Sequence, residues 1–206
     1  MVGYKTRKSN AKGNEIRNTS HELRQKNRGK KVLITDVAID KVPKVAFKGM
    51  SDEIASRVQQ AHKDLLRFAK EQNDSNEVAC LLDITNGNRT EFIKGDQTSV
   101  DILSSAECYH WLRVMPERTV MLLHNHPGQS YFSDRDIIVS LENESIGIMS
   151  IVTNQGKIWT IQKNDRYTFK NAREAFKKCI TESGGSYRDA VDEFLKGGYN
   201  YGIERS

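Results

Sequence analysis

A short apolar run followed by two histidines constrains this chain more than any other feature. Residues 119–123, Thr-Val-Met-Leu-Leu, are β-branched and aliphatic, which predicts a buried strand. His124 and His126 follow that run, and residues two apart project to the same face of a strand. Both imidazoles can therefore reach one ion while Asn125 points away from it. Pro127 then ends the strand.

A helix start comes shortly after the histidines. Ser133 is a residue type that caps helix N-termini, and Asp136, three positions later, falls in the first turn. Apolar residues at 137, 138 and 141 continue the helix. A strand end and a helix start would thus bring His124, His126 and Asp136 to one cation. Three protein ligands leave one coordination position for water.

Two imidazoles and one carboxylate with a vacant position are typical of a hydrolytic zinc centre, because structural zinc usually has four ligands rich in cysteine. Zn²⁺ is therefore the expected ion, although the same donors suit ferrous iron and other divalent metals. The ordinary structural alternative is a Ser-x-x-Asp helix start beside packed histidines. Two histidines spaced by one residue, a proline and that helix start together favour the metal site.

A water nucleophile needs a nearby carboxylate as general acid and base, and two glutamates are candidates. Glu77 opens the apolar run 77–82, which predicts a buried strand, and Asn86-Gly87 predicts a hairpin turn into residues 89–94. A glutamate at the start of an apolar strand is unexpected unless solvent or a partner receives it. Glu91, among polar neighbours on the second strand, fits a solvated face. Glu77 is the favoured general base.

These residues resemble a known family. Glu77 with its apolar strand, the His-Asn-His-Pro sequence from His124 and the Ser-x-x-Asp sequence from Ser133 are similar to the JAMM metalloproteases, also called JAB or MPN-plus. The form of the motif is most similar to their RadC-like branch, bacterial or phage, and the resemblance spans about residues 77–163. Six residues separate His126 from Ser133, one fewer than in the commonest form of the motif.

The resemblance implies a fold, a ligand set and a reaction. The fold would be α/β with a cytidine-deaminase-like arrangement, a mixed sheet flanked by helices. His124, His126 and Asp136 would bind zinc, Glu77 would be the general acid and base, and Ser133 would donate a hydrogen bond to the oxyanion. The reaction would be hydrolysis of a peptide or isopeptide bond in a protein substrate, for which a ubiquitin-like protein is one candidate.

Two other functions remain open at this point. A RadC-like protein can be associated with DNA or mobile elements, and a phage-associated processing or structural module can keep the metal site while catalysis is secondary. Residues 1–31 bear on the first, because they hold ten Lys or Arg and two Glu, a net charge of +8 within a whole-chain charge of +5. We expect this basic segment to be a disordered arm that either solvates the chain or contacts nucleic acid.

The rest of the chain is expected to form one domain with an extension. We predict a metalloprotease domain at 32–163 and a helical C-terminal extension at 164–206. His62 is placed on the solvated face of its helix, and Gly197-Gly198 predicts that the last residues fray. The predicted elements include a short strand at 32–34, helices at 52–70, 100–114, 169–181 and 187–195, and a hairpin at 147–162.

Composition narrows the class of protein further. With 37% hydrophobic residues in 206, the chain can bury one moderate core. No run approaches about eighteen apolar residues and the N-terminus does not read as a signal peptide, so we expect a soluble, cytoplasmic protein without a membrane partner. The three cysteines, Cys80, Cys108 and Cys179, are odd in number and form no Cys-x-x-Cys pair, which argues against a disulfide framework.

Overall fold

The structure is a computed structural model that describes residues 31–205. The predicted arm at 1–31 lies outside the described residues, apart from Lys31. The same holds for Ser206 at the other end of the sequence.

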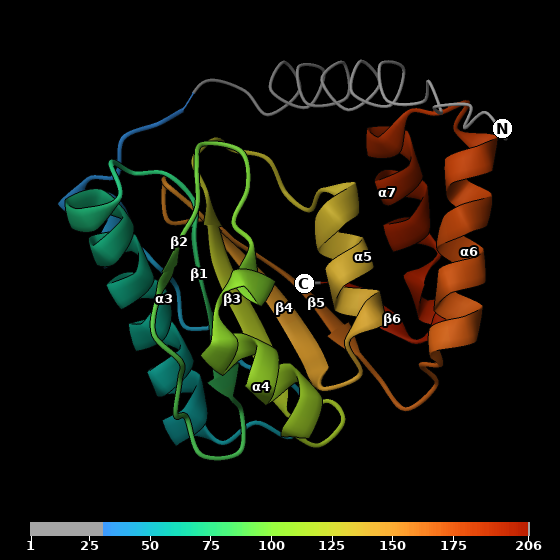
Figure 1. The fold of residues 1–206 in the computed structure, drawn as a ribbon, viewed down its shortest axis with the longest axis horizontal. Coiled ribbons are helices and arrows are strands. Elements are labelled where there is room, and N and C mark those ends of the chain that lie inside the picture. Colours follow the sequence, from blue (N-terminus) through green and yellow to red (C-terminus); the bar gives the residue numbers. More distant parts are fainter. Residues whose placement is uncertain (1–30, 206) are drawn as a thin grey trace, which may run out of the picture.

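Six strands form one mixed sheet in the order β2-β1-β3-β4-β5-β6 (Figure 1). The central strands β3 and β4 are parallel, and every other neighbouring pair is antiparallel. This arrangement confirms the predicted α/β class with a mixed sheet. The strands are β1 (Val78–Asp83), β2 (Ile93–Lys94), β3 (Val120–His126), β4 (Ile146–Thr153), β5 (Ile158–Lys163) and β6 (Ile203–Arg205).

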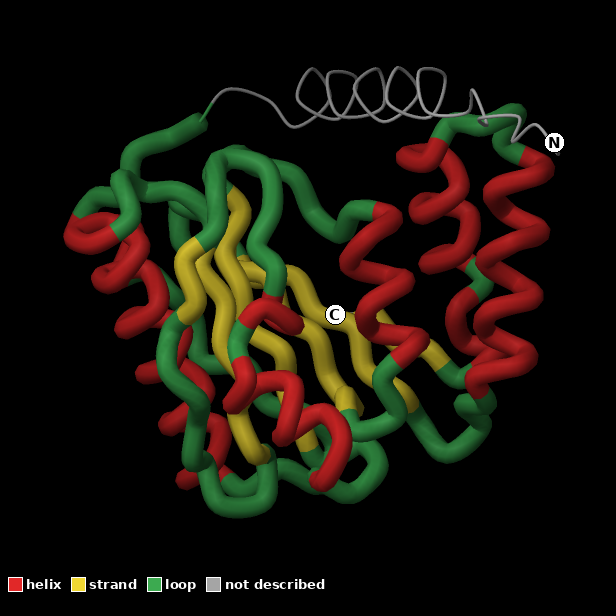
Figure 2. The backbone as a smooth tube through the Cα atoms, in the orientation of Figure 1, coloured by secondary structure: helices red, strands yellow, loops and turns green. Residues whose placement is uncertain are grey.

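Helices cover both faces of the sheet, so the chain has three layers (Figures 1 and 2). One face packs on α3 (Asp52–Gln72), with α2 (Asp36–Asp40) beside it. The other face packs on the remaining helices: α4 (Ala106–Val114), α5 (Asp134–Glu142), α6 (Phe169–Glu182) and α7 (Tyr187–Lys196), with the short 3-10 helices η1 (Ile102–Ser104) and η2 (Gly198–Tyr201). No helix within residues 31–205 has the length and apolar character needed to cross a bilayer.

Strand β3 is buried along its whole length, and its side chains alternate between the two cores. Leu122 packs in the core beneath α5, whereas Leu123 packs in the core beneath α3. Because the alternation continues along the strand, His124 and His126 face the α5 side and Asn125 faces the α3 side. The two histidines therefore share one face, as the sequence predicted.

Helix α3 buries a residue that the sequence analysis placed in solvent. The helix starts at the N-cap Ser51, and its apolar positions pack on the sheet. The prediction that His62 is solvated was wrong, because the ring is fully buried between the helix and β4. Its Nδ1 donates to the Val58 carbonyl at 2.9 Å and its Nε2 accepts from Ser150 Oγ at 2.8 Å. Burial lowers the pKa of His62 to about 4, so the ring is neutral near pH 7.

Residues 198–205 form a 3-10 helix and a strand, contrary to the prediction from Gly197-Gly198 that the last residues fray. Helix η2 follows those glycines, Gly202 turns the chain with a positive φ of 81°, and β6 then pairs antiparallel with β5. Tyr201 stacks on Phe194 with ring centroids 4.9 Å apart. The reason for the error is that the partner of β6, the free edge of β5, lies about forty residues earlier in the chain. The C-terminal helices therefore share the core with the rest of the sheet.

Two further elements differ from those predicted. Residues 32–34 form no strand. The single helix expected at 100–114 is divided at Ser105, which ends η1 and caps α4 through a hydrogen bond from the Cys108 amide. In both places a serine hydroxyl accepts from a backbone amide: Ser75 from Ile34, and Ser105 from Cys108.

Because the buried, neutral His62 has a pKa of about 4 against 6.5 in the unfolded chain, stability is lost as the pH falls from about 6.5 to about 4. We expect acidification from about pH 7.5 to about pH 4.5 to lower the free energy of unfolding of the wild type by about 2–3 kcal/mol more than that of His62→Gln. Urea denaturation at the two pH values measures this difference. Parallel losses in the two proteins would contradict a buried neutral imidazole.

Candidate metal centre

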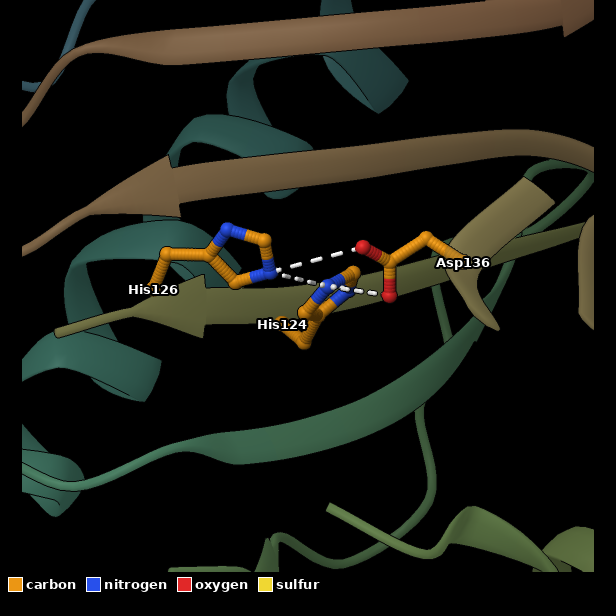
Figure 3. A group of neighbouring side chains, drawn as sticks. All are labelled: His124, His126 and Asp136. Carbon is orange, nitrogen blue, oxygen red and sulfur yellow. Dashed lines mark hydrogen bonds and ion pairs between the residues drawn. The ribbon is translucent and has the colours of Figure 1, made fainter. Parts of the chain in front are cut away.

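The imidazoles of His124 and His126 lie side by side at the C-terminal end of β3 (Figure 3). Both residues are buried, with 3% and 1% of their surface exposed. Their Nε2 atoms are 3.1 Å apart, and the ring planes meet at 62°. The rings are thus turned edge to face, with the same nitrogen of each directed toward one point.

A backbone carbonyl fixes the tautomer of His126. Its Nδ1 lies 3.0 Å from the carbonyl oxygen of Ser130. A carbonyl can only accept, so Nδ1 carries the proton, and the lone pair on Nε2 is directed at the cluster. Sequence reasoning missed this contact, because a backbone carbonyl leaves no signal in residue type.

Asp136 reaches the histidines from the first turn of α5. Ser133 is the N-cap, and the two residues form a capping box: the Asp136 amide donates to Ser133 Oγ at 3.2 Å, and the Ser133 amide donates to Asp136 Oδ2 at 2.6 Å. The Ser133 hydroxyl also donates to Oδ2, at 2.6 Å. These bonds hold the carboxylate with Oδ1 3.3 Å from His124 Nε2 and Oδ2 3.6 Å from His126 Nε2 (Figure 3).

Asp136 is ionised in this setting. Burial raises the pKa of the carboxyl, but the two imidazoles and the Ser133 hydroxyl lower it by more, so the net pKa is held well below its usual range. The N-terminus of α5 adds to this effect, because its partial positive charge favours an anion in the first turn. The site therefore offers one fixed negative charge to a cation.

The spacing of the three groups suits a tetrahedral metal ion. With bonds of about 2.0–2.1 Å to nitrogen and oxygen, two ligands of a tetrahedral ion lie about 3.3–3.4 Å apart. The imidazole nitrogens are 3.1 Å apart, and each lies 3.3 or 3.6 Å from one of the two Asp136 oxygens, which is close to that value. All three residues offer ligand atoms within 4.8 Å of one another. His124, His126 and Asp136, the three ligands predicted from the sequence, form a group that can hold a metal ion.

Two buried side-chain nitrogens lack a hydrogen-bond partner within residues 31–205, and one belongs to this site. They are His124 Nδ1 and Trp159 Nε1. The two residues lie in one row across the sheet, separated by Ile151, and so share the α5 face. The His126 ring is held through its second nitrogen, which binds the Ser130 carbonyl. Within residues 31–205 the second nitrogen of His124 has no such partner, so the His124 ring is oriented by packing and by the ligand cluster.

Glu77 is buried directly before β1, with 2% of its surface exposed. Its amide donates to the Asp96 carbonyl and its carbonyl accepts from the Gly95 amide, which fixes its backbone. Ala79 pairs with His124, so extending this antiparallel register by two residues places Glu77 opposite His126 and on the same sheet face. A general base for a water bound at this site has to lie on this face of the sheet.

Glu91, the alternative general base, lies on the surface. Glu91 is exposed, and its amide donates to the Glu107 carboxylate at 3.1 Å. The Cys108 thiol is buried against Thr90, and burial raises its pKa. Neither residue therefore has the surroundings of a reactive group, and the positions favour Glu77.

Comparisons with protein-family models, curated proteins and solved structures give no match for this chain. The chemistry assigned to the site consequently depends on the residues themselves, their distances and their burial.

Replacing one histidine should remove metal binding. Because His126 supplies one of three ligands, we expect His126→Ala to weaken zinc binding on the order of 100-fold or more relative to a wild type that binds one ion per chain. Titration calorimetry on chelator-treated protein measures both values. His110→Ala, an exposed histidine on α4, is the control and should bind as the wild type does. Equal affinities in all three proteins would exclude His126 as a ligand.

The two functions of the capping box can be separated. Ser133→Ala removes the cap and should destabilise the fold by about 0.5–2 kcal/mol, while zinc affinity falls only about 10-fold through the lost bond to Asp136. Asp136→Asn removes the charged ligand and should lower zinc affinity by more than about 100-fold. Thermal unfolding of the metal-free proteins and zinc titration report the two effects. A larger loss of affinity in Ser133→Ala than in Asp136→Asn would reverse the roles.

Proposed function

We propose that this chain is a zinc-dependent hydrolase of peptide or isopeptide bonds related to the JAMM metalloproteases. The observation that carries the proposal is the convergence of two imidazoles and one carboxylate at the end of a central strand. A structural zinc site would have four protein ligands, whereas three leave a position for a reacting water. A buried glutamate at the start of the neighbouring strand supplies the remaining catalytic group.

The position of the site in the sheet supports the same proposal. β3 and β4 are the parallel pair, α5 connects them, and the ligands lie at the C-terminal end of β3 and at the N-terminus of α5. Sites in α/β sheets form at the carboxyl ends of parallel strands, where loops diverge and a helix N-terminus points at the ligand. The cytidine-deaminase-like architecture of the JAMM family is the specific fold that we propose for this arrangement.

Proton transfer in the proposed reaction falls to Glu77. When bound, zinc supplies Lewis acidity, which lowers the pKa of water and polarises the substrate carbonyl. Glu77 accepts the proton of the attacking water and later donates it to the departing amine, so it ends the cycle in its starting state. Its fixed backbone holds the carboxylate on the sheet face that carries both histidines.

Ser133 needs one hydrogen-bond exchange to act on the oxyanion. In the structure its hydroxyl proton is donated to Asp136 Oδ2. Redirecting that proton to a substrate oxygen leaves Oδ2 with the hydrogen bond from the Ser133 amide, so Asp136 keeps its orientation. We propose that Ser133 switches between these two acceptors as charge develops on the carbonyl oxygen.

The substrate class follows from the proposed reaction and not from a recognised surface. The bond cleaved would be an amide, either in a linear peptide or between a carboxyl terminus and a lysine side chain. A ubiquitin-like protein linked to lysine is the substrate that the family resemblance favours. A panel of linear peptides and lysine-linked peptides, each with and without chelator, distinguishes the two kinds of bond.

Replacing Glu77 should stop turnover without releasing the metal. Glu77→Gln keeps the size of the side chain but removes the proton acceptor, so we expect kcat to fall by at least about 100-fold. Zinc stoichiometry should stay at the wild-type value, because Glu77 is outside the ligand group. Cleavage of the peptide panel and metal analysis of the same samples measure both quantities.

Glu91→Gln is the matched control, since it makes the same substitution at an exposed position. It should retain wild-type turnover. Full activity in Glu77→Gln would reject Glu77 as the general base, and chelator-insensitive cleavage in the wild type would reject the metal-dependent reaction.

A further inference from the structure

Asn125, which separates the two histidines, is fully buried and forms three hydrogen bonds. Its Oδ1 accepts from the Val78 amide at 2.7 Å. Its Nδ2 donates to the Asn76 carbonyl at 3.1 Å and to Asn154 Oδ1 at 2.8 Å. Asn76 and Val78 are the two neighbours of Glu77 in the chain, so this one side chain binds the backbone on both sides of Glu77.

Asn154, the partner of Asn125, is also fully buried and lies just after β4. The backbone amide of Asn154 donates to the His126 carbonyl at 3.0 Å. Its Nδ2 donates to the Val32 carbonyl at 2.7 Å and to the Ser75 carbonyl at 2.8 Å. Together, Asn125 and Asn154 form a buried amide pair that joins the ends of β3 and β4 to the segment before β1.

The amide pair also fastens an N-terminal strap, defined as residues 31–34. The Val32 amide donates to the Pro127 carbonyl at 2.7 Å, directly after the second histidine. The Ile34 amide donates to Ser75 Oγ at 3.1 Å. The strap thus binds the backbone carbonyl of Pro127 and the side-chain hydroxyl of Ser75.

These contacts bear on the chemistry because the metal centre depends on small distances. Metal–ligand bonds vary by only about 0.2 Å, and a general base must lie within hydrogen-bond reach of its water. His124 and His126 are the chain neighbours of Asn125, and Glu77 lies between the two backbone groups that Asn125 binds. One buried amide therefore fixes the metal ligands and the proposed base relative to each other.

We propose that the Asn125–Asn154 pair positions the metal centre: it sets the distance between the histidine ligands and Glu77 from the opposite face of the sheet. This inference rests on the proposed function, because it concerns the same site. Neither asparagine touches the metal or the substrate in the proposal, so both are positioning residues. A purely stabilising role is the competing explanation, and it predicts loss of stability without a change in the metal site.

Zinc affinity and cobalt spectra of two variants separate these explanations. We expect Asn125→Ala and Asn154→Ala each to weaken zinc binding by about 10–100-fold, as loss of supporting contacts around metal ligands does elsewhere. In the cobalt-substituted proteins, the visible absorption bands should shift in position and intensity, because the coordination geometry changes. Asn143→Ala is the matched control; it removes an amide that donates to the Val139 carbonyl at the end of α5 remote from Asp136. It should leave affinity and spectrum unchanged.

A measurement on the wild type does not depend on whether the variants fold. If the amide pair and the metal site are coupled, zinc must strengthen the hydrogen bonds of the pair by the same free energy with which the pair strengthens zinc binding. Zinc should therefore slow hydrogen exchange of the Val32, Val78 and Asn154 amides about 10-fold more than that of the Gly197 amide, which caps α7.

Wild-type zinc affinity and an unchanged cobalt spectrum in both variants, or equal zinc effects on all four amides, would overturn the inference while leaving the proposed function intact. A wild type that binds no zinc would overturn both. A further loss of kcat in zinc-saturated Asn125→Ala, with unchanged KM, would support the part of the inference that concerns Glu77.

Discussion

Strand β3 lies between two layers of helices, so a polar side chain at its C-terminal end is buried and loses its contact with water. The apolar residues of β3 pack in the two cores, whereas His124, Asn125 and His126 form its polar end. An unpaired buried polar group costs about 1–3 kcal/mol. The two faces provide different partners. On one face the Asp136 carboxylate lies beside the two histidines. On the other face Asn125 forms hydrogen bonds with the Val78 amide and with Asn154. Two of the three candidate metal ligands and the amide that supports them thus come from a single strand.

Asp136 serves the fold and the site with the same carboxylate. As the third residue of α5 it completes the capping box with Ser133, and as a candidate metal ligand it faces both histidines. The two uses agree electrostatically, because a helix N-terminus and a metal ion both favour an anion. Since the cap fixes the carboxylate before any ion binds, less ordering remains to be done on binding. The start of α5 is in this sense part of the candidate metal centre.

Local patterns predicted much of the site, and non-local contacts account for what they missed. The strand, the shared face of the histidines and the N-cap at Ser133 depend on neighbours within a few positions, and the structure brings them together. His62 was assigned to solvent because its partner, Ser150, is 88 residues away. Strand β6 was missed because only the edge of β5 makes it a strand. The bond from Asn154 to Val32 spans 122 residues and follows from no sequence period.

The two edges of the sheet have a consequence for association between chains. β2 has two residues and β6 has three, so each outermost strand offers only a short row of unpaired amides and carbonyls. Short edge strands give a foreign strand little to pair with. The neighbour of β6 in the sheet, however, is β5, which has six residues. If β6 detaches, the backbone amides and carbonyls of β5 on that side lose their partners. Residues 203–205 therefore cover the edge of β5, and their release would expose a template for cross-β aggregation.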